Sequence, residues 1–293
     1  MNIPAPASSN IDHGTVTGFG EEWAAYDQSA LDGVEFETLF NAYFGIFPFA
    51  SLPPDAEGFD LGCGSGRWAA GVAPLVGLLH CIDPAEKALD VARRRLGAAT
   101  NVRFHIASAD TIPLPDNSQH FGYSLGVLHH IPDTGRALAD CVRKLRPGAP
   151  FLVYLYYKLD GRPWWFRLLW RSSDVVRRMI FRLPFAMRKA VTAVIATLVY
   201  WPLARGARLA EWLGFDVSNL PLAAYRGLSF YTMRTDALDR FGTRLEQRFS
   251  RDEVEAMMRA AGLTGIRFSE REPYWVACGR REDPPGAGRR RAV

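Results

Sequence analysis

The chain lacks several features that would assign it to a class at once. Its four cysteines have neither paired nor metal-like spacing, which indicates reduced thiols in a cytosolic protein rather than a disulfide framework. No basic stretch followed by an apolar core opens the chain, so no signal peptide is expected. The apolar run 191–203 is about 13 residues long, short of the ~20 that a membrane-crossing helix needs. We therefore expect a cytoplasmic protein, and 48% hydrophobic residues are ample for its core.

The stretch 59–69, FDLGCGSGRWA, places Gly62, Gly64 and Gly66 at alternate positions. An apolar run precedes it, a helix-like sequence follows it, and Asp83 closes a second apolar run, LLHCID. A strand, a glycine turn, a helix and a strand that ends in an acid form the nucleotide half-site of a doubly wound fold. The carboxylate there can accept hydrogen bonds from two ribose hydroxyls. The sequence therefore predicts a nucleotide-like ligand at this turn.

Two familiar phosphate-binding patterns are absent from the turn. Its spacing is GxGxG rather than the dinucleotide GxGxxG, and no Lys-Ser/Thr follows as in a P-loop. With Asp60 before it and Asp83 after it, the turn resembles the S-adenosylmethionine (SAM) site of class I methyltransferases. The stretches IPLPDNS, YSLGVLHHIPD and LRPGAPFLVY match later motifs of that superfamily in the same order. The resemblance covers roughly residues 55–157 and is nearest to the ubiquinone/menaquinone-biosynthesis type of small-molecule methyltransferase.

Strands and helices alternate along the central part of the chain. Apolar runs predict strands at 57–61, 78–82, 102–106, 121–125 and 151–156, with helices at 67–75, 85–96 and 134–145. This alternation predicts an α/β fold with a parallel sheet covered on both faces. A capping box at Ser250 and Glu253 begins a later helix that ends near Gly262. The resemblance implies a Rossmann-like seven-stranded methyltransferase fold that ends in an antiparallel hairpin, here residues 266–270 and 275–280.

The chain divides into six predicted segments. They are a disordered tail (1–14), N-terminal cap helices (15–50), a SAM-binding core (51–157), a helical aromatic and basic insertion (158–225), the C-terminal part of the core (226–281) and a disordered tail (282–293). The insertion therefore separates the fifth strand from the final hairpin.

The insertion is rich in tryptophan and arginine. Residues 161–210 carry ten basic side chains against one acid, Asp174. Trp165, Leu168 and Met179 belong to an apolar set at helical spacing with arginines between, which predicts an amphipathic helix ended by Pro184. Four interpretations stay open: a cap over a bulky apolar acceptor, a structural or dimer element, an in-plane membrane helix, and a nucleic-acid patch.

The resemblance implies a role for each motif residue around SAM. Asp60 contacts the methionine amino group through the turn, and Asp83 binds the ribose hydroxyls, although Asp83 could equally cap the following helix. The adenine amino contact could come from Ser108, from Asp110 or from neither, because Ser108 stands where an Asp is usual. The other implied cofactor contacts are Gly62, Cys63, Gly64, Pro84, Ala109, Leu125 and Gly126.

Methyl transfer requires alignment of the acceptor with the methyl group and, for some acceptors, removal of a proton. His129 follows the fourth strand and is the candidate general base, whereas His130 is expected to cap the next helix or fill the flank of the sheet. Tyr26 is the second catalytic candidate. The other expected acceptor contacts are Trp23, Trp165, Tyr225, Tyr231 and Arg248. No metal is expected, because the histidines other than the pair 129–130 are scattered.

These patterns together predict a SAM-dependent methyltransferase that acts on a small or medium, largely apolar acceptor. A quinone, an isoprenoid or lipid, or a secondary metabolite is the expected class. The alternatives are an RNA or protein methyltransferase that uses the basic insertion, and a SAM-binding protein without transfer activity. A homodimer and peripheral membrane contact are further expectations, and nucleic acid is disfavoured because no RNA-binding module is visible.

Overall fold

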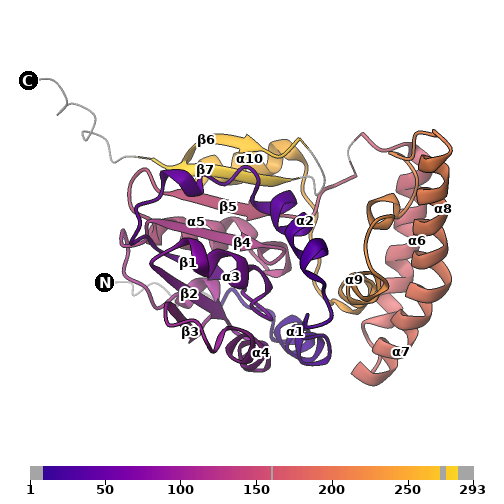
Figure 1. Cartoon of the computed structure of the whole chain (residues 1–293), viewed down its shortest axis with the longest axis horizontal. Coiled ribbons are helices and arrows are strands. Elements are labelled where there is room, and N and C mark those ends of the chain that lie inside the picture. Colours follow the sequence, from indigo (N-terminus) through magenta and orange to yellow (C-terminus); the bar gives the residue numbers. More distant parts are fainter. Residues whose placement is uncertain (1–8, 160, 271–274, 283–293) are drawn as a thin grey trace, which may run out of the picture.

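The computed structural model describes residues 9–159, 161–270 and 275–282, and its centre is one mixed sheet (Figure 1). Within these residues, seven strands run in the order β3-β2-β1-β4-β5-β7-β6. Their bounds are β1 Glu57–Leu61, β2 Leu78–Asp83, β3 Val102–Ile106, β4 Phe121–Leu125, β5 Pro150–Tyr154, β6 Leu263–Phe268 and β7 Val276–Arg281. The first five strands pair in parallel, whereas β7 is antiparallel to both β5 and β6. The predicted seven-stranded α/β fold with a final antiparallel hairpin is confirmed.

Helices cover both faces of the sheet. One face packs Phe121 and Tyr123 against α2, α3 and α4, and the other packs Phe59 and Phe151 against α5 and α10. Strands buried on both sides must be apolar throughout, as the runs that predict them are. The covering helices are α2 Gly33–Phe44, α3 Arg67–Val72, α4 Glu86–Leu96, α5 Thr134–Lys144 and α10 Arg251–Ala260. Short helical turns are η1 Phe49–Ser51, η2 Ala73–Leu75, η3 Ala109–Thr111, η4 Leu128–His130 and η6 Ala223–Tyr225.

Side-chain caps start several of these helices. The Asp133 side chain accepts a hydrogen bond from the backbone N of Arg136, which satisfies one free N–H at the start of α5. Ser250 and Glu253 form the predicted capping box at the start of α10. Both helices therefore begin where the sequence predicts.

Helix α1 (His13–Ala25) begins earlier than the sequence predicts. Asp12 Oδ1 accepts a hydrogen bond from the backbone N of Thr15 at 2.7 Å and caps the helix. Asn10 is only 4% exposed. The expected disorder of residues 1–14 is therefore wrong for residues 9–14. Residues 1–8 and 283–293, which make up most of the two predicted tails, lie outside the described residues.

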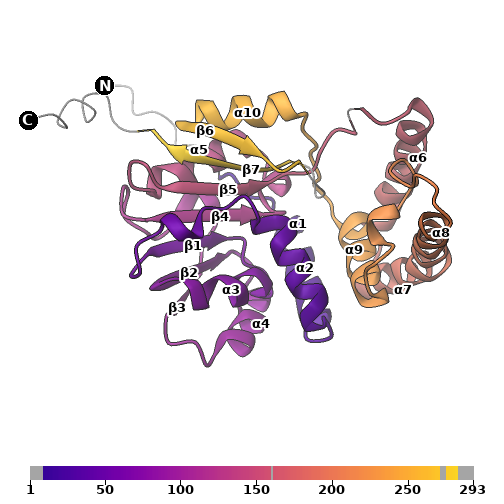
Figure 2. The ribbon, with the colours of Figure 1, turned by 45° about the horizontal axis from the view of Figure 1, so that its top comes forward.

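The segment between β5 and α10 forms a helical cap beside the sheet (Figures 1 and 2). Its helices are α6 Trp164–Ile180, α7 Phe185–Ile195, the π-helical turn η5 Ala196–Tyr200, α8 Trp201–Trp212 and α9 Phe230–Gly242. Ile180, Tyr200, Met233 and Phe241 belong to one buried cluster of this cap. Because α9 supplies Met233 and Phe241, the cap reaches residue 242, and the predicted boundary at residue 225 falls too early.

Helices α7 and α8 are joined by η5 into one continuous helix, Phe185–Trp212, of 28 residues. By length and composition this helix could cross a membrane, whereas the apolar run in the sequence suggested too short a segment. Its inner side packs on α9 through Ala196, Tyr200 and Ala204. Length and composition do not distinguish a spanning helix from one that packs on protein in this way.

Candidate functional site

The glycine turn joins β1 to α3 at the carboxyl edge of the sheet. Gly62 and Gly64 have φ angles of 76° and 53°, in the left-handed region that favours glycine. A Cβ on Gly62 would lie 2.4 Å from Val127 Cγ2, and one on Gly64 would lie 2.9 Å from Trp23 Nε1. The Gly62 N–H donates to the Ile82 carbonyl at 2.7 Å. The turn is therefore tied to β2 and leaves only bare backbone at these positions.

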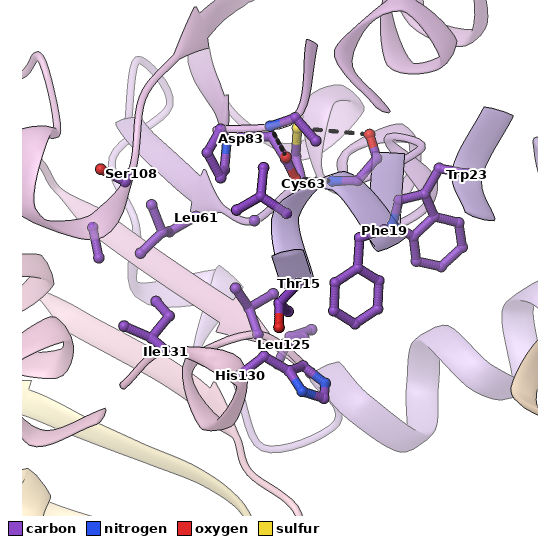
Figure 3. A pocket seen from close by; sticks show the side chains of 18 of the residues that line it. Thr15, Phe19, Trp23, Leu61, Cys63, Asp83, Ser108, Leu125, His130 and Ile131 are labelled. Atoms are coloured by element: carbon purple, nitrogen blue, oxygen red, sulfur yellow. Dashed lines mark hydrogen bonds between the residues drawn. The ribbon is translucent and has the colours of Figure 1, made fainter. Parts of the chain in front are cut away.

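Asp83 lies at the end of β2 beside this turn (Figure 3). Its Oδ2 accepts a hydrogen bond from the Gly64 N–H at 2.9 Å, and its Oδ1 accepts one from the Ala85 N–H at 2.8 Å. Burial raises the pKa of the Asp83 carboxyl to about 6, against the lowering effect of these two hydrogen bonds. Each oxygen keeps a second lone pair, so the carboxylate can still accept hydrogen bonds from a ligand.

A cavity opens above the turn and encloses about 920 Å³ of empty space, some of it open to solvent. Residues at the carboxyl ends of four parallel strands form one wall: Gly62, Cys63 and Gly64 after β1, Asp83 and Pro84 at β2, Ser108 and Ala109 after β3, and Leu125 and Gly126 at β4. Open α/β sheets bind ligands at this edge. The structure thus brings together most of the predicted cofactor residues.

Helix α1 and the segment before it form the opposite wall of this cavity. Thr15, Phe19 and Trp23 recur every four residues and line it (Figure 3). The Asn10 N–H donates to Asp110 Oδ2 at 3.0 Å, and Asn10 Nδ2 donates to the Asp133 carbonyl at 2.9 Å. Of this wall the sequence predicts only Trp23, although Asp12 three residues before Thr15 is a helix-capping pattern.

The residues that form this edge of the sheet match a known protein family. Residues 59–153 match a family model described as a methyltransferase domain. These residues form a class I, SAM-dependent methyltransferase domain.

Curated relatives share this domain rather than their full length. Phosphoethanolamine N-methyltransferase 2 of Caenorhabditis elegans is 31% identical over 116 residues, which cover 39% of this chain and 26% of that protein. A ubiquinone biosynthesis O-methyltransferase of Aromatoleum aromaticum is 35% identical over 95 residues, which cover 30% of this chain and 39% of that protein. The chain thus spans between a quarter and two fifths of the length of these relatives.

A solved structure matches over more of the chain. A chain in the complex of the Haloferax volcanii Trm112 methyltransferase activator with a methyltransferase covers 91% of this chain and 98% of its own length. The TM-score is 0.50 and the identity is 13%. This likeness supports the fold alone.

The cofactor of the methyltransferase domain is SAM, and the groups on the cavity wall fit it. The Asp83 carboxylate has free lone pairs for ribose hydroxyls, and the backbone at Gly62 and Gly64 has no Cβ in the way. Ala109 and Pro84 supply apolar surface for adenine. When bound, SAM supplies a methyl group on a sulfonium, and the residues of this chain hold and orient it.

Two predicted cofactor residues lie behind the cavity wall. Asp60 is 1% exposed, and burial together with the Asp83 carboxylate raises its pKa to about 8. Asp110 accepts hydrogen bonds from Asn10 and from Ser108. Of the alternatives for adenine, Ser108 reaches the wall and Asp110 does not. Direct contacts of Asp60 and Asp110 with SAM stay predictions.

The two histidines after β4 are placed in the opposite way from the prediction. His129 is fully buried and stacks on Tyr156, with ring centroids 3.8 Å apart, and it does not line the cavity. Burial, aided by His130 and Arg248, holds the pKa of His129 well below its ordinary value. The predicted role of His129 as a base facing the methyl site is therefore wrong.

His130 lines the cavity instead, with its ring 4.9 Å from that of Phe19 (Figure 3). Its Nδ1 lies 2.6 Å from the Leu245 carbonyl oxygen, which can only accept, so Nδ1 carries the proton. The neutral ring then presents Nε2 as an acceptor, and this atom has no hydrogen-bond partner among the described residues. His130 is thus the histidine that could bind or deprotonate a ligand.

Glu22 of α1 is a buried acid that the sequence analysis missed. It is 3% exposed, and its Oε1 has no hydrogen-bond partner within the described part of the chain. Burial, followed by the charges of Asp239 and Asp236, raises the pKa of Glu22 well above its ordinary value. The spacing of Thr15, Phe19 and Glu22 in the sequence places all three on one side of α1. This spacing is the pattern by which the sequence indicates that Glu22 lies beside the other two.

Glu22 lines a second cavity on the cap side of α1, with about 700 Å³ of empty space that is partly open to solvent. Thr15 and Phe19 line both cavities. Phe181, Phe185, Arg188 and Leu238 belong to the remaining wall. Helix α1 therefore lies between the two cavities, one with the cofactor motifs and one with side chains of the cap.

Most of the predicted acceptor contacts lie away from both cavities. Trp23 lines the cofactor cavity. Tyr26 and Tyr231 pack edge to face, with centroids 6.0 Å apart, and Arg234 lies over the Tyr26 ring. Because neither tyrosine reaches a cavity wall, the predicted catalytic role of Tyr26 finds no support in this geometry.

The remaining three predicted acceptor contacts are Tyr225, Arg248 and Trp165. Tyr225 is packed against Tyr200 inside the cap. The Arg248 guanidinium lies over the rings of Tyr156 and Trp170. Trp165 is 39% exposed and lines neither of the two cavities. Its contact with an acceptor stays a prediction.

Proposed function

We propose that this chain transfers the methyl group of SAM to a small or medium acceptor with a largely apolar body. A quinone, an isoprenoid or lipid, or a secondary metabolite fits that description. The observation that carries the proposal is the pair of cavities that share Thr15 and Phe19. One holds the cofactor motifs, and the other offers an acceptor a place beside them.

The walls of the second cavity are mixed, with an apolar part for the body of an acceptor and several polar groups for its reacting end. Phe181, Phe185 and Leu238 provide apolar surface, and Glu22 provides an unpartnered carboxyl oxygen. Arg188 is held at the same cavity by its ion pair with Glu21, 3.0 Å away. Thr243 and Arg244 add further polar groups to this wall, and polar groups on a cavity wall fix the orientation of a ligand.

Glu22 and His130 are the two groups that could take a proton from a hydroxyl or amine acceptor. Each residue lines a cavity and has a buried acceptor atom without a hydrogen-bond partner among the described residues. Burial raises the pKa of Glu22, and a carboxylate with a raised pKa is a stronger base than an ordinary one. In this scheme the acceptor oxygen or nitrogen attacks the methyl carbon of SAM, and its proton passes to one of these groups.

The test measures SAM binding and S-adenosylhomocysteine formation with a panel of quinols, isoprenoids, lipids and phenolic metabolites. We expect Glu22→Gln and His130→Ala to leave the Kd of SAM within a factor of about two. We expect one of them to lower kcat by about 100-fold, the usual effect of losing a general base. Glu37→Gln, on the exposed side of α2, is the matched control.

Other outcomes separate the alternatives. Absence of saturable SAM binding would contradict the proposal at its root. SAM binding with no product across the panel would favour a non-catalytic SAM-binding protein. Methylated RNA, with binding that weakens steeply in salt, would favour a nucleic-acid substrate.

A further inference from the structure

The outer side of α6 exposes a continuous apolar stripe. Trp164, Leu168, Val175 and Met179 are 71, 57, 54 and 64% exposed. Their spacing of four, seven and four residues places them along one side of the helix. The amphipathic helix that the sequence predicts is therefore present, but its apolar side faces away from the protein.

The inner side of α6 holds a buried network of polar side chains beside Ile180. Arg177 Nε donates to Asp174 Oδ1 at 2.7 Å, and Arg177 Nη1 donates to the Thr243 carbonyl at 2.8 Å. Arg240 Nη2 donates a hydrogen bond to Ser173 Oγ on the same side of α6, at 3.3 Å. Rotating α6 to bury its apolar stripe would break these buried interactions, at a large penalty. The outward orientation is therefore a stable property of the cap.

The long helix Phe185–Trp212 also has a buried inner side and an exposed apolar outer side. Thr192, Ala196, Tyr200 and Ala204 are buried on its inner side. The opposite side exposes several large apolar residues: Val194, Leu198, Trp201, Leu209 and Trp212, with exposed fractions from 48 to 79%. Both views place α6 and α8 at the end of the cap away from the sheet (Figures 1 and 2). We call the exposed apolar side chains of α6 and of Phe185–Trp212 the outer face.

The charge around the outer face is mainly positive. Arg167, Arg171 and Arg182 are exposed along α6 and its end. The acid of this helix, Asp174, is buried and paired with Arg177 and Arg178. On α8, Glu211 is paired with an arginine from elsewhere in the cap at 2.8 Å. The surface therefore combines tryptophans and aliphatic side chains with an excess of positive charge.

We propose that the outer face docks in the plane of an anionic lipid surface. Apolar residues enter the boundary between headgroups and acyl chains, and the arginines reach anionic headgroups, as in other interfacial helices. A second copy of this chain fits less well, because an isologous contact would set these arginines against one another. A spanning arrangement fits less well too, because the inner side of Phe185–Trp212 is already packed on α9.

The proposal stands apart from the proposed function, since it concerns a surface that neither cavity uses. The test is sedimentation of the whole protein with vesicles of phosphatidylcholine alone or mixed with phosphatidylglycerol. We expect binding to the mixed vesicles, weakening as salt rises, and little binding to phosphatidylcholine alone. The SAM affinity of each variant is measured alongside, so that failure of docking is distinguishable from failure of the cofactor site.

Paired variants locate the contact. W164S/L168S on α6 and L198S/W212S on the long helix should each weaken vesicle binding by about tenfold or more, because large side chains leave the lipid. R167Q/R171Q should reduce the salt dependence. The controls are V34S/L75S, which remove exposed apolar side chains on the core, and R251Q/R259Q, which remove charge on α10. None of the controls should change binding.

Three results would overturn the proposal. The first is absence of binding to the mixed vesicles at low salt. The second is a dimer in solution that W164S/L168S or L198S/W212S converts to a monomer, without vesicle binding, which would assign the outer face to a second copy. The third is protein that stays with the vesicles after an alkaline carbonate wash, which would indicate a spanning helix.

Discussion

At the scale of single residues, Asp83 has two tasks. Its two oxygens fix the backbone of Gly64 and Ala85, while the same carboxylate faces the cofactor cavity. We expect Asp83→Ala to weaken SAM binding by about 1–3 kcal/mol, because polar groups on both sides lose their partner. Calorimetry gives the Kd, and Asp90→Ala, half exposed on α4, is the control. An unchanged Kd would remove Asp83 from the site.

The buried carboxyl of Asp60 should make the unfolding free energy fall as the pH rises. Burial raises its pKa to about 8 in the folded chain, so the folded state holds a proton that the unfolded state has released above pH 3.8. Its contribution to stability is therefore lost as pH rises through about 8. We expect the cofactor-free protein to lose about 2 kcal/mol more unfolding free energy between pH 6 and 9 than Asp60→Asn does. Urea titrations at the two pH values measure this, and parallel losses in both proteins would refute the assignment.

The sequence predicted the cofactor side of the site far better than the acceptor side. Gly62, Asp83 and Ala109 are positioned by strand ends that the topology makes neighbours, so local patterns are enough to place them. His129 and His130 are adjacent residues in the short turn η4, and no local sequence pattern indicates which of the two rings faces the cavity. Glu22 depends on how α1 packs against the cap, which only the folded chain determines.

At the scale of elements, α1 acts as the outer wall of the cofactor cavity. Asn10 ties this wall to the core through Asp110 and Asp133. We expect Asn10→Ala to lower the unfolding free energy by about 1–3 kcal/mol, because buried partners lose hydrogen bonds, and to weaken SAM binding as the wall loosens. Urea unfolding and calorimetry measure both effects. Thr17→Ala, on the exposed side of α1, is the control, and equal behaviour of the two variants would contradict the role of Asn10.

The strands and helices also show which structural features can be predicted from the sequence. Strands β1 and β4 begin and end where the apolar runs predict, since a doubly covered sheet leaves no other place for such runs. Helix α6 shows the opposite case. Its pattern of Leu168, Met179 and the arginines predicts an amphipathic helix correctly, but it does not say whether protein or another phase covers the apolar side.

At the scale of the whole molecule, the cofactor cavity lies between parts that come together only on folding. Its walls come from α1 and from four strand ends, and so SAM binds the folded state alone. We expect SAM at 100 times its Kd to raise the unfolding free energy by about 2.7 kcal/mol. Asp83→Ala should lose about 1 kcal/mol or more of this gain at the same SAM concentration. Denaturation with and without SAM measures it, and stabilisation that survives in Asp83→Ala would indicate binding elsewhere.

The sheet order has a consequence for synthesis on the ribosome. Strand β5 pairs with β7, yet the whole cap and α10 are translated between Tyr154 and Val276. Until β7 emerges, the nascent chain carries Pro150–Tyr154 as an open edge strand, the kind of edge that recruits other chains. Ribosome stalling or truncation before residue 276 should therefore yield aggregates rather than a smaller soluble domain. The last strand to be made is the one that closes this edge.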